Sequence, residues 1–453
     1  MEIQDTLLQR HIVDINTYGA KDSIHRYECK ILAAGREVPA LFVDEFEQNR
    51  NYFENYTDVT RIRVAIVAGD YNRYIVPNRE EIKVTIKRIP LTPGMSPSES
   101  KVRSIKEQTF IGTLYEMNSA MVEGNTMHDA NPVKLNDIDF TVVNIRLRDE
   151  THENIRKRTV GGIFRDTNGA NIIKTILTAV SKEGLNDNET GILGVDIAPG
   201  FSTEKREQIL IPHMTPLAKF PRVVNEESGG LYPLGFRYYL QDRYWYIFAP
   251  FDVNKSDQGK RTLVIVNVPP NRMANPEVSY RLQDRTITIL ATGKTKFQDL
   301  SEDARLNEGA GIRFVDANKI LEDYASVENN KAVVKKANNV TEAVNDTIAK
   351  DKDNLVSQSS VKITSQYNLQ YSTLAARNGA LIQTVWEAAD ISYLYPGMGV
   401  KYLYLAGNRV EEKVGILISV NSISRRTNQN QGEARFSQSA SLTIFVDRKV
   451  KDL

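Results

Sequence analysis

The sequence has little of three features that mark common classes of protein. Cys29 is the only cysteine among 453 residues, which excludes an intrachain disulfide and a metal cluster held by thiolates. No run of about 18 apolar residues occurs, so we expect no membrane span. The first residues, without a basic start before an apolar core, predict no secretory signal. Lys and Arg number 58 against 57 Asp and Glu, a balance that does not indicate a dedicated nucleic-acid binder.

What the sequence does have is strand periodicity and enough apolar residues to bury cores, with 20 Tyr and 15 Phe. Over residues 1–150 the apolar side chains alternate with polar ones, the period of strands with one buried face. Residues 62–66 and 82–87 flank the turn-forming residues 69–73 and therefore predict a long antiparallel hairpin or meander. Residues 110–117 and 143–148 return to the same pattern, so this block predicts a mostly antiparallel β domain.

The segment 231–250 predicts a tight hairpin, because two aromatic-rich stretches flank the turn Gln241-Asp242-Arg243. Its large side chains would lie on both faces. One interpretation is cross-strand packing in a small β domain. The other is an interface, since a hairpin that is aromatic on both faces needs a cover for each of them. The aromatic residues are Phe236, Tyr238, Tyr239, Tyr244, Trp245, Tyr246 and Phe248.

Two segments differ from this strand pattern. Residues 169–184 carry apolar side chains at helical spacing, and Gly184 stands where a C-terminal cap belongs, which predicts an amphipathic helix. Residues 329–356 are poor in large apolar residues and predict either a polar linker or a weak helix.

The C-terminal part of the sequence predicts strands again, at 415–420 and 439–446. Between them lies a polar arm, residues 425–436, with three arginines against one glutamate. These two strands and the arm predict an extended hairpin with a polar tip. Such arms are usually solvated or ordered by a protein neighbour, although a contact with DNA is an alternative.

No motif proposes catalysis or a cofactor. Gly293-Lys294-Thr295 lacks the earlier glycine of a phosphate-binding loop, because position 288 is Thr. The five histidines are scattered without the spacing of metal ligands. Carboxylate pairs stand in no apolar setting that would raise a pKa. The sequence therefore predicts a protein that is not an enzyme, with no catalytic, cofactor-binding or metal-ligating residues.

In this organisation the chain resembles baseplate hub proteins of tailed bacteriophages, the family that ends the tail tube. The resemblance rests on terminal β blocks with long hairpins, at 60–90 and 414–447, and on the central segment GLYPLGFRYYLQDRYWYIFAP followed by a strand-rich insertion. It covers most of the chain coarsely.

The resemblance implies a mainly β fold with minor α, in which two tail-tube-like antiparallel β domains flank an inserted β/α region. The expected domains are an N-terminal tube-like β domain at 1–155, a connector with the amphipathic helix at 156–230 and an aromatic-rich β domain at 231–328. The polar linker or weak helix at 329–356 and a C-terminal tube-like β domain at 357–453 complete the chain.

The function that it implies is structural. Three copies would form a homotrimeric hub that joins the hexameric tail tube to the trimeric central spike, inside a virion assembled in the host cytoplasm. The partners would be the tube protein, the spike protein and other baseplate components, with a passing contact to genomic DNA and none to a membrane. The basic arm departs from the acidic or neutral lining of tube-like channels.

Alternatives remain open: another tail or baseplate component, such as a tube-terminating, wedge or sheath-initiating protein, or a glycan-binding or enzymatic β protein. For the hub, the expected interface residues are those of the polar arm and the aromatic hairpin. They are Arg425, Arg426, Asn428, Gln429, Asn430, Gln431, Arg435, Tyr239, Trp245 and Tyr246.

Overall fold

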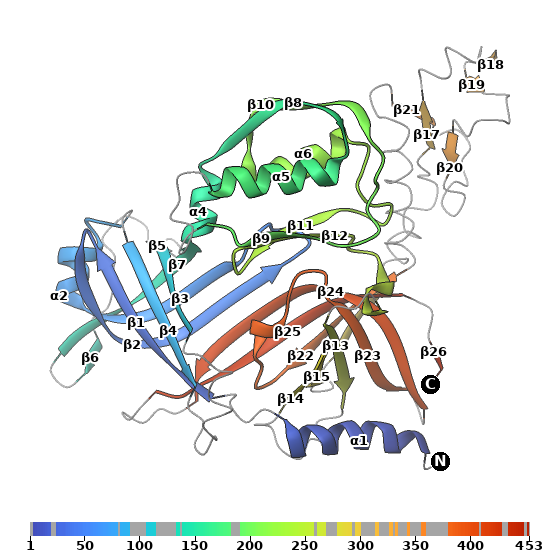
Figure 1. Ribbon diagram of the computed structural model, residues 1–453. Helices are drawn as coiled ribbons and strands as arrows, with labels where there is room; N and C mark the ends of the chain where they lie inside the picture. The colour runs from blue at the N-terminus through green and yellow to red at the C-terminus, as the bar shows by residue number, and fades with distance from the viewer. Residues whose placement is uncertain are drawn as a thin grey trace.

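Most strands of the protein join one large mixed sheet, and the few helices cover parts of it (Figure 1). The fold class predicted from the sequence, mainly β with minor α, is confirmed. This structure is a computed structural model. It describes residues 3–19, 24–79, 82–90, 106–114, 133–135, 138–182, 191–257, 261–268, 279–291, 295–299, 313–316, 326–328, 331–333, 342–344, 355–358, 379–406, 409–427, 434–447 and 451–452.

The first part of the sheet closes on itself as a barrel, which we call the first barrel. Its antiparallel pairs run β1–β2–β3–β7–β5–β4 and back to β1. Alternate side chains, such as Ile31, Val64 and Ile145, are buried in one apolar core. The strands are β1 (Ile24–Ala33), β2 (Arg36–Asn51), β3 (Val59–Val67), β4 (Ile82–Pro90), β5 (Lys106–Leu114) and β7 (Ile138–Asp149), with β6 (Val133–Leu135) paired to β7.

The predicted hairpin between residues 62–66 and 82–87 is wrong. Both stretches are strands, but β3 pairs with β2 and β7, whereas β4 pairs with β1 and β5. The chain between them forms the short helix α2 (Ala68–Asp70) and the π-helical turn η1 (Tyr71–Ile75). Tyr71 and Ile75 are buried in the core of the first barrel, so this segment is a packed connection rather than a tight turn.

A long C-terminal hairpin belongs to the first barrel and to the rest of the sheet at once. It consists of β24 (Arg409–Arg426) and β25 (Phe436–Asp447), which pair antiparallel as the sequence predicted. The far end of β24 pairs with the second half of β2, and His25 in β1 pairs with Phe436 in β25. The hairpin therefore separates one end of β1 from β2 and extends the barrel there to eight strands.

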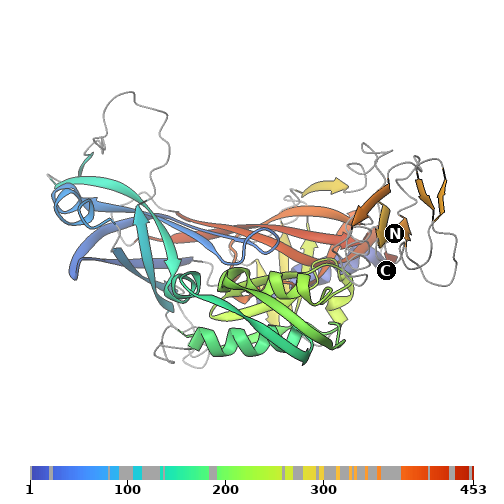
Figure 2. The same cartoon turned by 90° about the horizontal axis from the view of Figure 1, so that it is seen from above.

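The near ends of the same hairpin belong to another part of the large sheet, which we call the second sheet and whose strand order is β14-β15-β13-β23-β24-β25-β22-β16. Seen from above, the first barrel and this second sheet lie end to end (Figure 2). The added strands are β13 (Thr262–Asn267), β14 (Tyr280–Gln283), β15 (Thr286–Ala291), β16 (Thr295–Asp299), β22 (Gly379–Trp386) and β23 (Gly399–Ala406), with β26 (Lys451–Asp452) beside β24. A turn of 3-10 helix, η5 (Ile391–Tyr393), leads from β22 to β23.

The N-terminal residues form a helix, α1 (Ile3–Tyr18), and not strands as the period-two pattern of the N-terminal block predicted. Its apolar side chains pack on the second sheet, with Leu8 and Ile15 against Val266, Leu290 and Leu403. The helix therefore packs on strands that follow it much later in the sequence, rather than on the neighbouring barrel.

A third unit, which we call the middle unit, lies above the sheet in Figure 1. The amphipathic helix predicted at 169–184 is confirmed as α5, while Gly184 lies outside the described residues. The predicted aromatic hairpin is confirmed as β11–β12, with Asp242 and Arg243 at positive φ in its turn. The elements are α4 (Glu150–Arg156), β8 (Thr159–Thr167), α5 (Gly169–Lys182), β9 (Gly194–Ile197), β10 (Arg206–Pro216), η2 (Leu217–Lys219), α6 (Phe220–Glu227), β11 (Arg237–Gln241), β12 (Tyr244–Phe248) and η3 (Val253–Asp257).

The remaining described strands are short. The weak helix proposed for 329–356 is not found at the described positions, because residues 331–333 and 342–344 are strands that pair with β18 and β17. These strands are β17 (Arg313–Asp316), β18 (Ser326–Glu328), β19 (Lys331–Val333), β20 (Glu342–Val344) and β21 (Leu355–Gln358).

Candidate assembly surface

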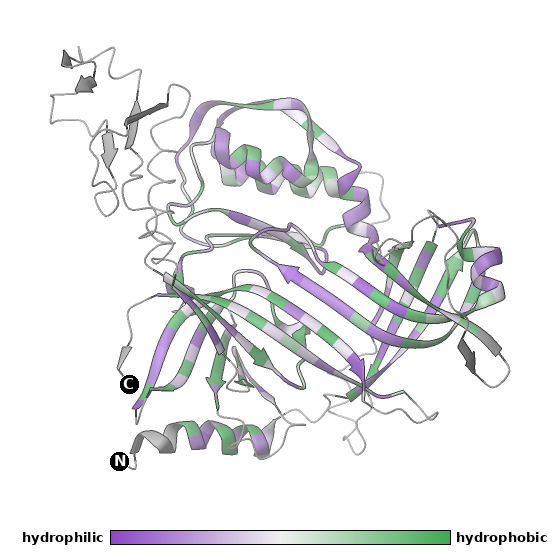
Figure 3. Ribbon diagram, turned by 180° about the vertical axis from the view of Figure 1, so that it is seen from behind, coloured by the Kyte–Doolittle hydropathy of each residue, from purple (hydrophilic) through white to green (hydrophobic). Residues whose placement is uncertain are grey.

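One face of the long shared hairpin is polar over its far half, apart from Ile423. In β25 the sequence SQSASLT alternates small hydroxyl residues with buried ones, so that Leu442 enters the apolar core while Ser441 lies on the other face. The same alternation runs along β24, and Figure 3 shows it as alternating bands along the strands. We call the half-buried or exposed residues of this side the polar sheet face. Paired across the strands, they are Ser419, Asn421, Ile423 and Arg425 in β24, Ser437, Ser439, Ser441 and Thr443 in β25, and Glu45, Glu47, Asn49 and Asn51 in β2.

Where the polar sheet face continues onto the first barrel, its charges pair across strands. Arg61 lies 3.5 Å from Glu47, and Arg63 lies 3.2 Å from Asp44. These pairs are exposed to solvent, so each contributes little to stability. Their effect is to cancel charge, since each arginine stands beside a carboxylate of the neighbouring strand.

In the described part of the predicted polar arm, the two arginines of β24 have different neighbours. The guanidinium of Arg425 lies 3.6 Å from a carboxylate oxygen of Glu45, and that of Arg426 lies over the ring of Phe42 at 5.7 Å. The hairpin is closed at its described end, where Thr427 donates a backbone hydrogen bond to the carbonyl of Arg435 at 2.8 Å. Phe436 is fully buried in the core of the first barrel, so the base of the arm is anchored in this chain. The remaining predicted interface residues of the arm, Asn428, Gln429, Asn430 and Gln431, lie outside the described residues.

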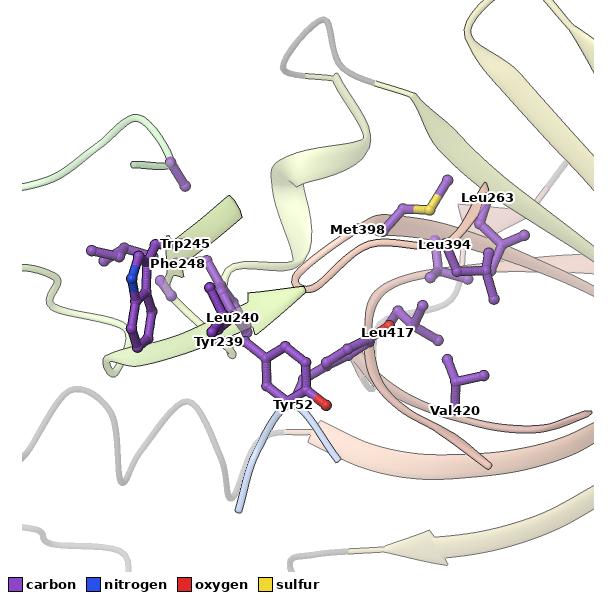
Figure 4. Close-up of a cluster of buried hydrophobic side chains, with 14 of the residues drawn as sticks. Tyr52, Tyr239, Leu240, Trp245, Phe248, Leu263, Leu394, Met398, Leu417 and Val420 are labelled. Atoms are coloured by element: carbon purple, nitrogen blue, oxygen red, sulfur yellow. The ribbon is translucent and has the colours of Figure 1, made fainter. Parts of the chain in front are cut away.

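The aromatic hairpin is buried at its centre. Tyr239 and Trp245 are both fully buried, and Tyr246 is half-buried with its ring stacked 6.1 Å from that of Tyr395. Tyr239 meets Tyr52 edge to face at a centroid distance of 4.8 Å (Figure 4). Within one chain, Tyr239 and Trp245 are therefore packed in a core, as the first interpretation of this hairpin predicted. A role of these residues in an interface stays a prediction.

Below this hairpin lies a buried polar network that the sequence analysis did not identify. Asp58 accepts hydrogen bonds from Gln48 Nε2 at 2.5 Å, Arg50 Nε at 3.0 Å and the Tyr239 hydroxyl at 2.9 Å. Arg50 also donates to the carbonyl of Ile391 at 3.0 Å. The network thus joins the first barrel, the middle unit and the turn that follows β22.

Electrostatics in this network follow from burial. Burial works against the charge of Arg50, but the Asp58 carboxylate and its neighbours outweigh it, so the pKa of Arg50 lies above its ordinary value. Burial, and after it Asp58, raise the pKa of Tyr239 well above its ordinary value. The tyrosine therefore stays protonated and donates to the carboxylate. No single motif marks Arg50 and Asp58. They come together only because the chain turns at residues 51–58, between β2 and β3, a segment that we call the β2–β3 corner.

Among the described residues, no group of three or more His, Cys, Asp and Glu side chains could hold a metal ion. Burial raises the pKa of the Cys29 thiol to about 12, which keeps it protonated at neutral pH. None of the described helices is both long and apolar enough to cross a membrane.

Comparison with known proteins gave matches at the level of structure alone. No family model matches the sequence, and no curated protein matches it. The chain is similar to the 43 kDa tail protein of prophage MuSo2 from Shewanella oneidensis, with 10% identity, a TM-score of 0.47, and coverage of 92% of this chain and 98% of that one.

Two further matches are of the same kind. The prophage tail protein gp18 from Listeria monocytogenes has 9% identity, a TM-score of 0.39, and coverage of 93% and 95%. The E. coli c3393 protein, a type VI secretion component described as similar to the T4 phage tail proteins gp27 and gp5, has 10% identity, a TM-score of 0.40, and coverage of 92% and 76%.

The matched structures are tail and tail-like proteins. Of the residues predicted for the interface of a baseplate hub, the structure brings Arg425 onto the polar sheet face and Arg426 beside it. It places Tyr239, Trp245 and Tyr246 in the middle unit.

Proposed function

We propose that this protein is a structural component of a phage tail, and more specifically a hub that joins a six-fold tail tube to a three-fold central spike. The observation that carries this proposal is the shared hairpin. Because β24 and β25 belong both to the first barrel and to the second sheet, one chain holds two β units in a fixed relation. Three such chains would present six β units in a ring.

Symmetry gives this arrangement its use. A closed ring of three copies has a three-fold axis, and two β units per copy supply the six positions that a six-fold tube requires. The middle unit occurs once per chain, so three copies of it could only follow the three-fold axis. An adaptor between the two symmetries needs both features.

The sheet also offers ways to associate with other copies. In the described strand order, β14 and β16 stand at the two ends of the large sheet, and an end strand leaves backbone hydrogen-bonding groups for another chain. Phe297 in β16 is 57% exposed, an unusual position for a phenylalanine on an end strand. The polar sheet face, in contrast, needs no apolar cover, as expected for a wall of a water-filled channel.

The partners that follow from this proposal are two further copies, the tail tube protein, the central spike protein and other baseplate components. The site of action is the virion, after assembly in the host cytoplasm. Genomic DNA would pass along the channel without a specific site, because Arg61, Arg63 and Arg425 each stand beside a carboxylate. The role is structural and not catalytic.

The test is the symmetry of the purified particle, measured by mass photometry and electron microscopy. We expect a trimer that co-assembles with tube and spike proteins. Phe297→Asp should leave the monomer folded, because the side chain is exposed. It should weaken association into the trimer at least tenfold, because a charge replaces an apolar side chain on an end strand. The matched control is Leu210→Asp, at a residue 53% exposed on the middle unit, which should leave the trimer intact.

Other results would favour other functions. A ring with six-fold symmetry alone would indicate a tube-terminating, wedge or sheath-initiating protein. A monomer that gains thermal stability with a sugar, or turns over a small compound, would indicate a glycan-binding or enzymatic protein instead.

A further inference from the structure

Helix α1 is attached to the molecule in an unusual way. It ends at Tyr18, and β1 begins at Ile24 in the first barrel, yet its apolar contacts are with the second sheet. In Figure 1 it lies below that sheet, apart from the barrel to which its sequence leads. The helix is therefore joined in sequence to the first barrel but packs on the second sheet.

The surface beneath α1 is an apolar sheet face. In β13, Leu263 and Ile265 enter the large core shared with the middle unit, while Val266 and, just after the strand, Val268 belong to the separate core beneath α1. We call this sheet face the strap face. Its buried residues are Val266, Val268, Leu290, Leu403 and Val410, and the other buried residues of the same small cluster, Leu8 and Ile15, come from α1.

From Leu8 onward, α1 presents its side chains to both the sheet and the solvent. Among these described side chains, Leu8 and Ile15 are buried against the strap face and Ile12 is partly buried, whereas Val13 is 60% and Tyr18 is 68% exposed. A groove open to solvent, with polar side chains such as His11, Thr286 and Thr288 in its lining, runs between the helix and the sheet.

Polar contacts hold the last turn of α1. Arg281 in β14 lies 3.4 Å from Asp14 Oδ2, and its guanidinium stands 5.1 Å from the centre of the Tyr18 ring. All of these groups are partly exposed, so water can replace the contacts at little cost. Elements with few buried apolar contacts open first in a folded protein.

We propose that α1 is a releasable strap, and that in an assembly the strap face is taken by α1 of a neighbouring copy. An identical helix makes the same contacts with Leu403, Val410 and Arg281 whichever chain supplies it. Exchange of an identical element between copies is a low-cost route to association. The helix is suited to it because it contacts one β unit and is tethered to the other. This exchange rests on the proposed function in one respect, which is that the ring supplies the neighbouring copies.

Release of the strap is tested on the full chain at concentrations where it is monomeric. By hydrogen exchange, amides of α1 should exchange at least tenfold faster than those of β13 and β15. Protection of α1 equal to that of β13 and β15 would overturn the proposal without bearing on the ring.

Docking is tested with a labelled synthetic peptide of residues 1–19. Leu8→Ser with Ile15→Ser in the full chain should release its own helix and bind the peptide at least tenfold more tightly than the unmodified chain. Val13→Ser on the exposed side is the matched control and should behave as the unmodified chain. No binding of the peptide by the double variant, with its circular dichroism unchanged, would overturn the strap face as a docking surface.

Exchange between copies is tested by reversing the charges of one contact. Asp14→Arg and Arg281→Asp should each make α1 exchange faster in the assembled protein, and a one-to-one mixture of the two variants should restore protection to half of the helices. A mixture that behaves as the average of the two variants would show that each helix stays on its own chain. A chain that is monomeric at every concentration would overturn the ring and the exchange together.

Discussion

At the scale of single residues, the aromatic hairpin shows how one sequence pattern admits two structures. Its strands place Tyr239 and Tyr246 on one face and Leu240 and Trp245 on the other. The first face meets Tyr52 at the β2–β3 corner, and the second is buried in the same core beneath α5 and α6 (Figures 1 and 4). The cover that both faces require is thus supplied largely within the chain. A sequence gives no sign of whether that cover is intramolecular.

The burial of Trp245 leads to a stability prediction. Trp245→Ala should lower the free energy of unfolding by about 3–5 kcal/mol, because it removes a fully buried indole from a packed core. Tyr244→Ala, next in sequence but 40% exposed, is the control and should change it by about 0.5 kcal/mol or less. Urea unfolding of both variants measures the difference. A cost below about 1 kcal/mol for Trp245→Ala, with loss of a binding partner, would support the interface interpretation.

His152 gives a prediction for pH dependence. Burial lowers the pKa of His152 to about 4, although Glu153 acts in the opposite direction. The ring lies 2.7 Å from the Tyr56 hydroxyl, in a hydrogen bond that joins α4 to the β2–β3 corner. In the unfolded chain the imidazole of His152 binds a proton near pH 6.5, whereas in the folded chain it stays neutral down to about pH 4. The folded state therefore loses stability as the pH falls from about 6.5 to 4.

The size of this effect follows from the difference between the two pKa values. It amounts to about 3 kcal/mol at most, spread over that pH range. His152→Gln keeps a hydrogen-bonding group beside Tyr56 and should flatten the fall in melting temperature between pH 6.5 and 4. An unchanged pH profile in this variant would assign the acid sensitivity to other groups.

At the scale of elements, the sequence predicted what is local and missed what is distant. The hairpins β11–β12 and β24–β25 and the helix α5 follow from turn residues and spacing within short stretches of the chain. The pairing of β3 and β4 was predicted wrongly because strands that follow one another usually pair, whereas here β3 pairs with β7 and β4 with β1. The helix α1 was missed because its packing partners lie in a distant part of the sequence.

The sequence likewise identified only those features of the candidate surface that depend on neighbouring residues in the chain. Arg425 was identified from the local charge of the arm, but its partner Glu45 comes from β2, at the other end of the chain. Phe436 was included in a polar arm, although its burial depends on β1. The Arg50–Asp58 network was missed altogether, since burial of a charge becomes visible only when the units are placed together.

The shared hairpin makes a prediction at the scale of elements. Phe436→Ala should destabilise the first barrel by about 3–5 kcal/mol, because it leaves a cavity where β25 meets β1. The change is expected far from the mutation in sequence, as faster hydrogen exchange in β1 and β2. Ser437→Ala, on the polar sheet face of the same strand, is the control and should leave both strands protected. Faster exchange confined to β24 and β25 would contradict the role of this side chain in the barrel.

At the scale of the whole molecule, the units depend on one another. The first barrel is completed at one end by strands from residues 409–447, and the middle unit shares a core with the second sheet. Asp58 and Arg50 add polar links at the point where the three units meet. A molecule built in this way should transmit a load from one β unit to the other without an intervening hinge, which suits a ring that holds two partners together.

This dependence predicts the behaviour of fragments. Residues 1–155, the boundary expected for the first domain, should not fold alone, because β1 and β2 would lose the strands that separate their ends and Phe436 would be missing from the core. Co-expressed with residues 156–453, the same fragment should form a soluble complex with native circular dichroism. A 156–453 fragment that carries Phe436→Ala should form less of this complex with the 1–155 fragment than one that carries Ser437→Ala. An isolated 1–155 fragment that unfolds cooperatively, with the same midpoint in urea as in the full chain, would show instead that the barrel is complete without the hairpin.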